Sequence, residues 1–227
     1  MDWSIIEQWF TYQENSPLLF TQRYFWVFFA FVMGGFSLVY KHTARRNVFL
    51  FAVSLFFYYK TSGFYFIILL FSTVVDFVIG WAIYTNKVKW QRQFLVALSV
   101  LVNLMVLGYF KYAYFVLDFL HDLTGIELTV INSFALWTNQ AVGTNFVFEK
   151  ILLPVGISFF TFQTISYSVD IYRGHVKPVR NILDFGFYVS FFPQLVAGPI
   201  VRASEFIPQI PQPYQLSKQR AGLAVFW

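Results

Sequence analysis

A group of polar side chains lies inside an otherwise apolar stretch of the chain, between Pro154 and Asp170. Ser158, Thr161 and Gln163 all occur there, although a helix that faces lipid tolerates few such groups. Their hydroxyl and amide groups could line a polar tunnel that carries a substrate. They could equally hydrogen-bond where two helices pack closely, which is the commoner use of small polar residues in membranes.

Asp76 is a second candidate, because it lies near the middle of the apolar stretch 64–84. A carboxylate inside a membrane-spanning helix is costly and usually faces other helices. It could bind a proton or an ion on a transport path, or it could accept hydrogen bonds from a neighbouring Ser or Thr. We favour the second interpretation, in which Asp76 accepts structural hydrogen bonds. Binding of a proton or an ion would instead indicate a transporter or channel, which stays an alternative function.

The histidines give no catalytic residue. His42, His121 and His175 fall in expected loops, with no Ser, Asp or second His at helical spacing, so each is predicted to be a solvated loop residue. The chain also has no cysteine, no cluster of carboxylates and no glycine-rich phosphate loop, so no metal site is predicted. Asp170 and Arg173 are three residues apart, which predicts a weak ion pair at a helix end.

The composition places these candidates in a membrane protein. Of the 227 residues, 58% are hydrophobic and 12% are charged, whereas a soluble domain has about 45–50% and about 25%. This excludes intrinsic disorder and leaves too few polar side chains for a soluble surface. The net charge is +5, but the basic residues stand in small groups between apolar stretches. That pattern indicates a lipid bilayer as partner and not nucleic acid.

The apolar stretches predict an all-α integral membrane protein. A spanning helix needs about 20 mostly apolar residues, and we predict five transmembrane helices at 24–40, 47–59, 64–84, 94–120 and 151–171. A sixth segment, 185–200, contains Pro193, Gly198 and Pro199. Because proline removes a backbone donor and clashes with the preceding turn, this segment should be broken. It either crosses the membrane or re-enters on the same side.

Positive charges predict the orientation. Lys and Arg cluster at 41–46, 87–92 and 173–180, while the alternate loops hold few. The positive-inside rule therefore gives a multi-pass protein with these clusters in the cytoplasm and the N-terminus outside. More basic residues follow the sixth segment, at 202–220, which supports the re-entrant geometry over a crossing.

We expect one membrane domain over residues 1–227. Residues 1–12 place Trp and Ile side chains on one face, opposite acidic residues, which predicts an interfacial helix. Residues 121–150 form the one long polar stretch and are expected to be an extracytoplasmic loop. This loop could be a packed cap or a loose connection.

Two late blocks of the sequence resemble the membrane-bound O-acyltransferase superfamily. The first reads LPVGISFFTFQ at 153–163 and YSVDIYRG at 167–174, and the second reads FFPQLVAGPIVR at 191–202 and FIPQ at 206–209. Weaker similarities upstream, at 72–76 and 107–112, keep the family order. The branch that the chain resembles is that of alginate and related polysaccharide O-acetyltransferases. The structural motif residues of this resemblance are Pro154, Gly156, Asp170, Arg173, Pro193, Gly198 and Pro199.

The resemblance implies transfer of an acyl group, here acetyl, from a donor on the cytoplasmic side to hydroxyls of an extracytoplasmic polysaccharide such as alginate. The donor would be acyl-CoA or an acylated carrier, and no covalently bound cofactor is implied. Extracytoplasmic acetylation proteins would be partners, and the location would be the cytoplasmic (inner) membrane of a bacterium.

The catalytic histidine of the resembled family lies downstream of the GPIVR block, so we expect it beyond Trp227. The chain would then be an N-terminal portion that is inactive alone. Its candidates for the substrate path are Ser158, Thr161, Gln163 and Arg202, and Arg202 would either hold a donor phosphate or anchor the segment to lipid headgroups. A non-catalytic scaffold of a polysaccharide export complex is a further alternative.

Overall fold

The computed structural model describes residues 11, 12, 18, 20–126, 129–144, 146 and 150–214. All secondary structure in these residues is helical, which confirms the predicted all-α class. The elements are α2 (Arg23–Val39), α3 (Thr43–Ser62), the 3₁₀ turn η1 (Gly63–Tyr65), α4 (Phe66–Thr85), α5 (Lys89–Leu107), the π-helical turn η2 (Gly108–Tyr112), α6 (Ala113–Thr124), α7 (Ser133–Val142), α8 (Ile157–Arg173), α9 (Ile182–Ser190), α10 (Phe192–Ala197), α11 (Ala203–Phe206) and the 3₁₀ turn η3 (Ile207–Gln209).

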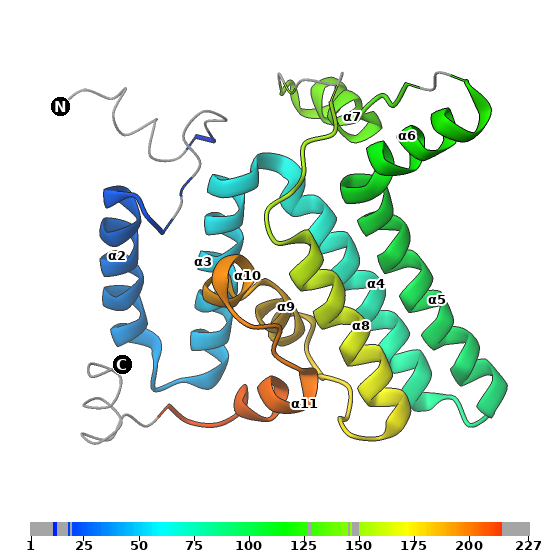
Figure 1. Ribbon diagram of the computed structural model, residues 1–227. Helices are drawn as coiled ribbons and strands as arrows, with labels where there is room; N and C mark the ends of the chain where they lie inside the picture. The colour runs from blue at the N-terminus through cyan, green and yellow to red at the C-terminus, as the bar shows by residue number, and fades with distance from the viewer. Residues whose placement is uncertain are drawn as a thin grey trace.

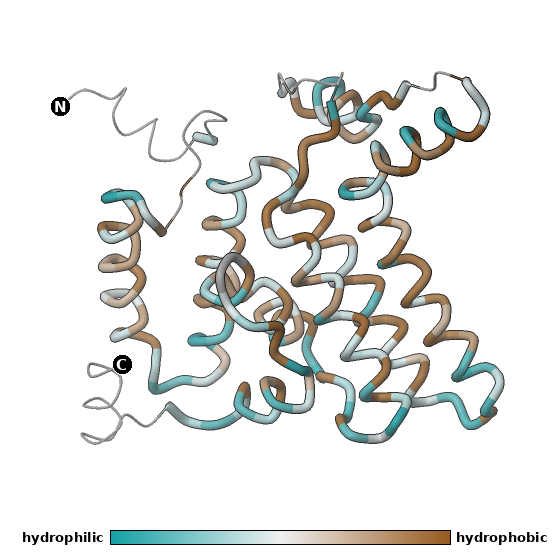
Figure 2. Tube along the Cα trace, viewed as in Figure 1, coloured by the Kyte–Doolittle hydropathy of each residue, from teal (hydrophilic) through white to brown (hydrophobic). Residues whose placement is uncertain are grey.

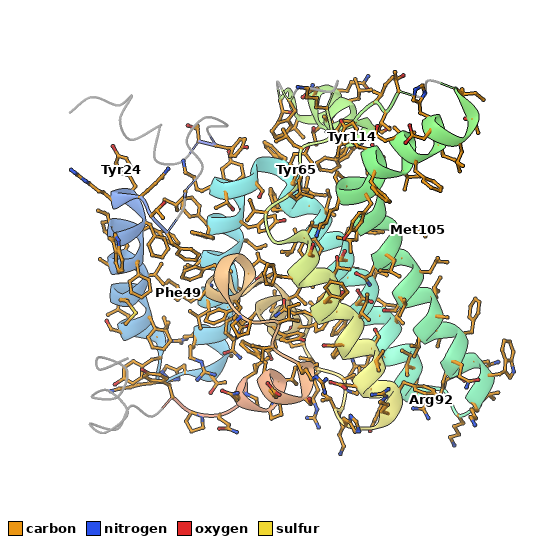
Figure 3. All side chains as sticks on the ribbon, in the orientation of Figure 1. Tyr24, Phe49, Tyr65, Arg92, Met105 and Tyr114 are labelled. Carbon is orange, nitrogen blue, oxygen red and sulfur yellow. The ribbon has the colours of Figure 1, made fainter. Side chains whose placement is uncertain are left out.

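The long helices stand side by side, and α8 lies at the centre of their packing (Figure 1). α8 packs mainly against α4 and α5, while α9 packs mainly against α3 and α4. α2 stands at one side and packs mainly against α3. Phe49 of α3 lies between these two helices (Figure 3), close against Gly35 of α2.

The helices are apolar along their middles and more hydrophilic toward both ends of the bundle (Figure 2). The basic segments 41–46, 87–92 and 173–180 all lie at the same end (Figure 1), which we call the basic end. Two hydrogen bonds hold the neighbouring segments together at this end, from Trp81 Nε1 of α4 to the carbonyl of Val179 (3.0 Å) and from Arg92 Nη2 of α5 to the carbonyl of Tyr172 of α8 (2.8 Å). The structure thus brings together the three loops that the charge pattern assigned to one side.

Within the described residues, two helical runs are long and apolar enough to cross a membrane, Thr43–Thr85 and Lys89–Thr124. The first run bends at Gly63, whose φ of +59° favours glycine. The bend divides it into α3 and α4, with 20 residues each. α2 is a shorter apolar helix, so the count of five spans stays a prediction.

Two of the predicted helix boundaries were wrong. The helix expected at 151–171 begins only at Ile157, because Gly156 takes a left-handed φ of +75° and precedes it as the N-cap. The helix expected at 94–120 is not continuous, because α5 ends at Leu107 and a π-helical turn leads into α6. α6 also extends the helix to Thr124, four residues into the stretch expected to be a loop.

Residues 121–150 contain a packed helix in their described part. α7 is capped by Asn132, whose side chain accepts a hydrogen bond from the backbone N–H of Ala135 (3.0 Å). The amide of Asn132 also donates to the hydroxyl of Tyr65 (2.9 Å) and to the carbonyl of Lys150 (3.1 Å). These contacts favour the packed cap over the loose connection. Residues 1–10 of the expected interfacial helix lie outside the described residues.

The sixth segment is broken, as its prolines predicted. It forms α9 and α10, which are separated at Phe191. Pro193 does not make the break itself, because it stands in the first turn of α10, where a missing N–H is tolerated. Gly198 then ends α10.

The segment also returns to the end at which it starts. At its start, Asp184 accepts a hydrogen bond from Asn47 of α3 (2.8 Å). Further along, the N–H of Phe192 donates to the hydroxyl of Ser54 of α3 (3.3 Å). Ser54 is seven residues beyond Asn47 on that helix, or about 10 Å at 1.5 Å per residue. The chain then comes back, and Arg46 donates to the carbonyl of Ile210 (2.6 Å).

Candidate functional site

Asp76 is fully buried on α4, and two side chains of α5 bind it. Ser99 Oγ donates to one carboxylate oxygen (2.5 Å), and Asn103 Nδ2 donates to the other (2.7 Å). Ser99 and Asn103 are themselves almost completely buried. They are four residues apart, so a helix places them on the same face. Both carboxylate oxygens therefore receive a hydrogen bond without a charged partner.

Two hydroxyl groups of α8 complete this network, which we call the Asp76 cluster (Asp76, Ser99, Asn103, Thr164 and Ser168). Thr164 Oγ1 donates to Asn103 Oδ1 (2.9 Å), and Ser168 Oγ lies 2.9 Å from Ser99 Oγ. Since Ser99 has one hydroxyl proton and gives it to Asp76, Ser168 is the donor in the second contact. The cluster ties α4, α5 and α8 together, which supports the structural interpretation of Asp76.

α8 also carries buried polar atoms that no hydrogen bond satisfies, and they lie on different sides of the helix, because Thr161 and Gln163 are two residues apart. Thr161 Oγ1 and Gln163 Oε1 have no hydrogen-bond partner among the described residues, and neither have Ser190 Oγ of α9 and Gln194 Oε1 of α10. α9 packs at the level of Gln163, because the hydroxyl of Tyr188 donates to its carbonyl (3.2 Å). An unsatisfied buried polar group costs about 1–3 kcal/mol. These positions are therefore where a polar ligand or water would find hydrogen-bonding groups.

The four predicted substrate-path residues do not form one compact site. Ser158 lies in the first turn of α8 and accepts a hydrogen bond from Lys111 Nζ (3.2 Å). Thr161 and Gln163 are buried further along the helix. Arg202 is exposed and precedes α11, which lies at the basic end (Figure 1). Ser158, Thr161 and Gln163 thus lie within the first two turns of α8, whereas Arg202 precedes α11 at the basic end.

The chain was compared with known proteins, and neither a family model nor a solved structure matches it. Curated relatives do match. The chain is 41% identical over 138 residues to the probable alginate O-acetylase AlgI of Pseudomonas aeruginosa, and equally to that of Azotobacter vinelandii. These alignments cover 60% of this chain and 24% and 25% of the relatives. The peptidoglycan O-acetyltransferase of Helicobacter pylori is 30% identical over 193 residues, which cover 74% of this chain and 33% of that protein.

The chain is a homologue of the alginate O-acetylases. The resemblance that its motifs indicated is thereby confirmed. The matched region spans about a quarter to a third of the length of these curated relatives.

Among the motif residues, Gly156 has a packing role. Gly156 lies so close to α10 that a Cβ there would stand 2.6 Å from the carbonyl oxygen of Leu195. Pro154 is buried and Pro199 is exposed. The expected pair of Asp170 with Arg173 was wrong, because Asp170 instead lies 3.5 Å from His175 Nδ1. His175 follows the helix end, where its N–H donates to the carbonyl of Asp170 (2.9 Å).

The histidines of the O-acetylase homologue all lie at exposed positions. His42 precedes α3, and His175 follows α8 with 56% of its side chain exposed. His121 was predicted in a loop but stands in the last turn of α6. His175 lies beside Asp170 of α8, whose Oδ2 is buried without a hydrogen-bond partner among the described residues.

Sequence reasoning missed two groups of partners in this O-acetylase homologue. The first is the pair Ser99 and Asn103, for which the signal is a polar pair at i, i+4 within an apolar helix. The second is the network of Arg46, Asn47 and Asp184. Arg46 is buried and binds Asn47 and the carbonyls of residues 210 and 212. Because these partners are 137 and more residues apart, local spacing could not have revealed them.

Proposed function

We propose that this chain is part of a membrane O-acyltransferase that transfers acetyl groups to hydroxyls of an extracytoplasmic polysaccharide such as alginate. The observation that carries the proposal is the 41% identity over 138 residues with probable alginate O-acetylases. The similarity to a peptidoglycan O-acetyltransferase supports the same reaction on a different polymer. The general base of the reaction would be a histidine outside these 227 residues.

The proposal places the chain in the cytoplasmic (inner) membrane of a bacterium as a multi-pass protein. The five crossing helices would be α2, α3, α4, α5 and α8, with the N-terminus outside. The apolar middles of these helices and the gathering of Lys and Arg at one end support this arrangement (Figure 2). α9 and α10 would then enter from the cytoplasm and return to it.

Topology reporters inserted after Lys177 and after Gln212 are expected to give the same cytoplasmic signal. The reason is that α9 and α10 lead back to the basic end. A reporter after Gly143, between α7 and α8, should give the opposite signal, which controls for misinsertion. The measurement is paired alkaline phosphatase and fluorescent protein activity in cells. Opposite signals after Lys177 and Gln212 would show that residues 185–200 cross the membrane.

The proposed substrate path runs along α8. The donor, acyl-CoA or an acylated carrier, would approach the basic end, where the exposed Arg202 can bind a phosphate or carboxylate. Thr161 and Gln163 would offer hydrogen bonds within the path, since their side-chain oxygens are otherwise unpaired. The acceptor hydroxyl would arrive at the end that holds Ser158, together with extracytoplasmic acetylation proteins.

Gln163→Met is expected to lower polysaccharide acetylation about tenfold or more, which corresponds to the loss of roughly 1.4 kcal/mol of interaction in the transition state. Thermal stability should be unchanged or raised, because methionine has a similar volume and removes an unpaired buried oxygen. The measurement is the acetyl content of the polymer in a strain whose own gene is replaced by the variant.

The matched control is Phe162→Leu, on the adjacent exposed position of α8, which should leave acetylation unchanged. Normal acetylation in Gln163→Met, with normal protein levels, would remove this residue from the path. It would also favour a non-catalytic scaffold.

A further inference from the structure

α6 differs from the other long helices because none of its side chains is buried. It turns away from α5 at the upper end of the molecule and projects from the bundle (Figure 1). The bundle therefore leaves most of the surface of this 12-residue helix uncovered.

The length of the helical run that contains α6 shows that it cannot simply continue the crossing of α5. The 36 residues of Lys89–Thr124 would extend about 54 Å at 1.5 Å per residue, against a hydrocarbon core of about 30 Å. Counted from Phe94, after the basic residues 87–92, the run already reaches about 28 Å at Tyr112, so the crossing can end before α6 begins. The π-helical turn η2 separates the two helices, and the change of direction occurs there.

The side chains around α6 divide into three faces at helical spacing. Tyr112, Phe115, Val116, Phe119 and Leu123 form an exposed apolar face, which we call the outer stripe, and Phe115 and Leu123 are 70% and 67% exposed.

Two other faces complete the helix. The polar face carries Asp118, His121 and Asp122, all exposed. The third face, with Ala113, Leu117 and Leu120, is half-buried and is turned toward the body of the protein. An amphipathic helix with one apolar and one charged face is typical of the boundary between lipid and water.

The outer stripe continues the lipid-facing side of α5. Leu101, Leu104 and Met105 of α5 are exposed and apolar, and Figure 3 marks Met105 on the outer side of that helix. Trp137 of α7, which is also exposed, adds an aromatic side chain at the same end, as is common at membrane interfaces.

We propose that α6 lies along the outer lipid–water interface, with the outer stripe in the boundary of headgroups and acyl chains and the polar face in water. The occupant of the stripe is therefore lipid. This inference rests on the membrane placement that the proposed function includes. α6 would also fix the depth in the membrane of the start of α8. The hydroxyl of Tyr114, in the first turn of α6, accepts a hydrogen bond from the N–H of Ile151 (2.8 Å), which shortly precedes α8.

The test uses single cysteines, because the chain contains none of its own. Phe115→Cys and Phe119→Cys report the outer stripe, and Asp118→Cys and Asp122→Cys report the polar face. Each protein is labelled with a nitroxide and reconstituted in liposomes of phosphatidylethanolamine and phosphatidylglycerol. Electron paramagnetic resonance then gives the accessibility to oxygen, which concentrates in lipid, and to a water-soluble nickel complex.

The expected result is a several-fold preference for oxygen at the outer stripe and for nickel at the polar face. Preference for nickel at all four positions would place α6 in water, and preference for oxygen at all four would make it a continued span. Protection of the outer stripe from both reagents would mean that protein covers it. Each of these three outcomes overturns the inference.

Leu101→Cys and Met105→Cys on α5 separate this inference from the proposed function. Both should prefer oxygen if the protein spans the membrane. If they prefer nickel, the membrane placement itself is wrong. If they prefer oxygen while the outer stripe does not, only the inference about α6 fails.

Discussion

Asp76→Ala is expected to lower the thermal unfolding midpoint of the protein by roughly 10 °C. The substitution leaves Ser99 Oγ and Asn103 Nδ2 buried without their acceptor. Each buried polar group left without its partner costs about 1–3 kcal/mol, and each kcal/mol shifts the midpoint by roughly 2–4 °C in a chain of this size. Fluorescence-detected gel filtration of heated, detergent-solubilised protein measures the change.

Ser72→Ala is the matched control, because Ser72 is on the same helix one turn before Asp76. Its hydroxyl is buried but has no partner among the described residues, so its removal should be neutral or stabilising. Asp76→Asn should fall between the two, since the amide keeps one acceptor oxygen. Equal midpoints in all three variants would contradict the structural role of Asp76. A lost ion flux in Asp76→Asn liposomes would favour a transporter instead.

Gly156→Ala is expected to destabilise the protein by about 2–5 kcal/mol, the sum of a backbone penalty and a steric one. Alanine in the left-handed region costs about 1–2 kcal/mol, and the φ of Gly156 is +75°. The new Cβ would also meet the carbonyl oxygen of Leu195 at 2.6 Å, so α10 must move away from α8. Acetylation should fall with stability, because Gly156 is the N-cap of the helix that carries Gln163.

Gly143→Ala separates the two penalties, because Gly143 has nearly the same φ, +74°, but nothing lies within 4 Å of its would-be Cβ. Its cost should be the backbone term alone, about 1–2 kcal/mol. Comparison of the two midpoints isolates the α8–α10 contact. Similar losses in both variants would mean that this contact contributes little.

The sequence predicted the helical class and the placement of the basic loops because both depend on local composition. The apolar stretches became helices, and the loops at 41–46, 87–92 and 173–180 lie at one end. Helix ends were less predictable. The start of α8 depends on the left-handed conformation of Gly156, which is set by a neighbour about 40 residues away.

The candidate site was predicted only in part for a related reason. Asp76 was identified by its charge in an apolar stretch, and its structural role was favoured at that stage. Its donors Ser99 and Asn103 are 23 and 27 residues away on another helix, so only the packing of α4 against α5 reveals them. The lack of partners for Gln163 Oε1 is likewise a property of its surroundings and not of its spacing.

The buried Arg46 has a consequence for the order in which the protein is made. α3 is synthesised with Arg46 and Asn47 near its start, but their partners Asp184 and the carbonyls of residues 210 and 212 follow 137–166 residues later. At about 5–20 residues per second, the ribosome needs on the order of 10 s to supply them. During that interval the start of α3 must stay in water or among headgroups, so the helix can settle to its final depth only after α9 and α11 have emerged.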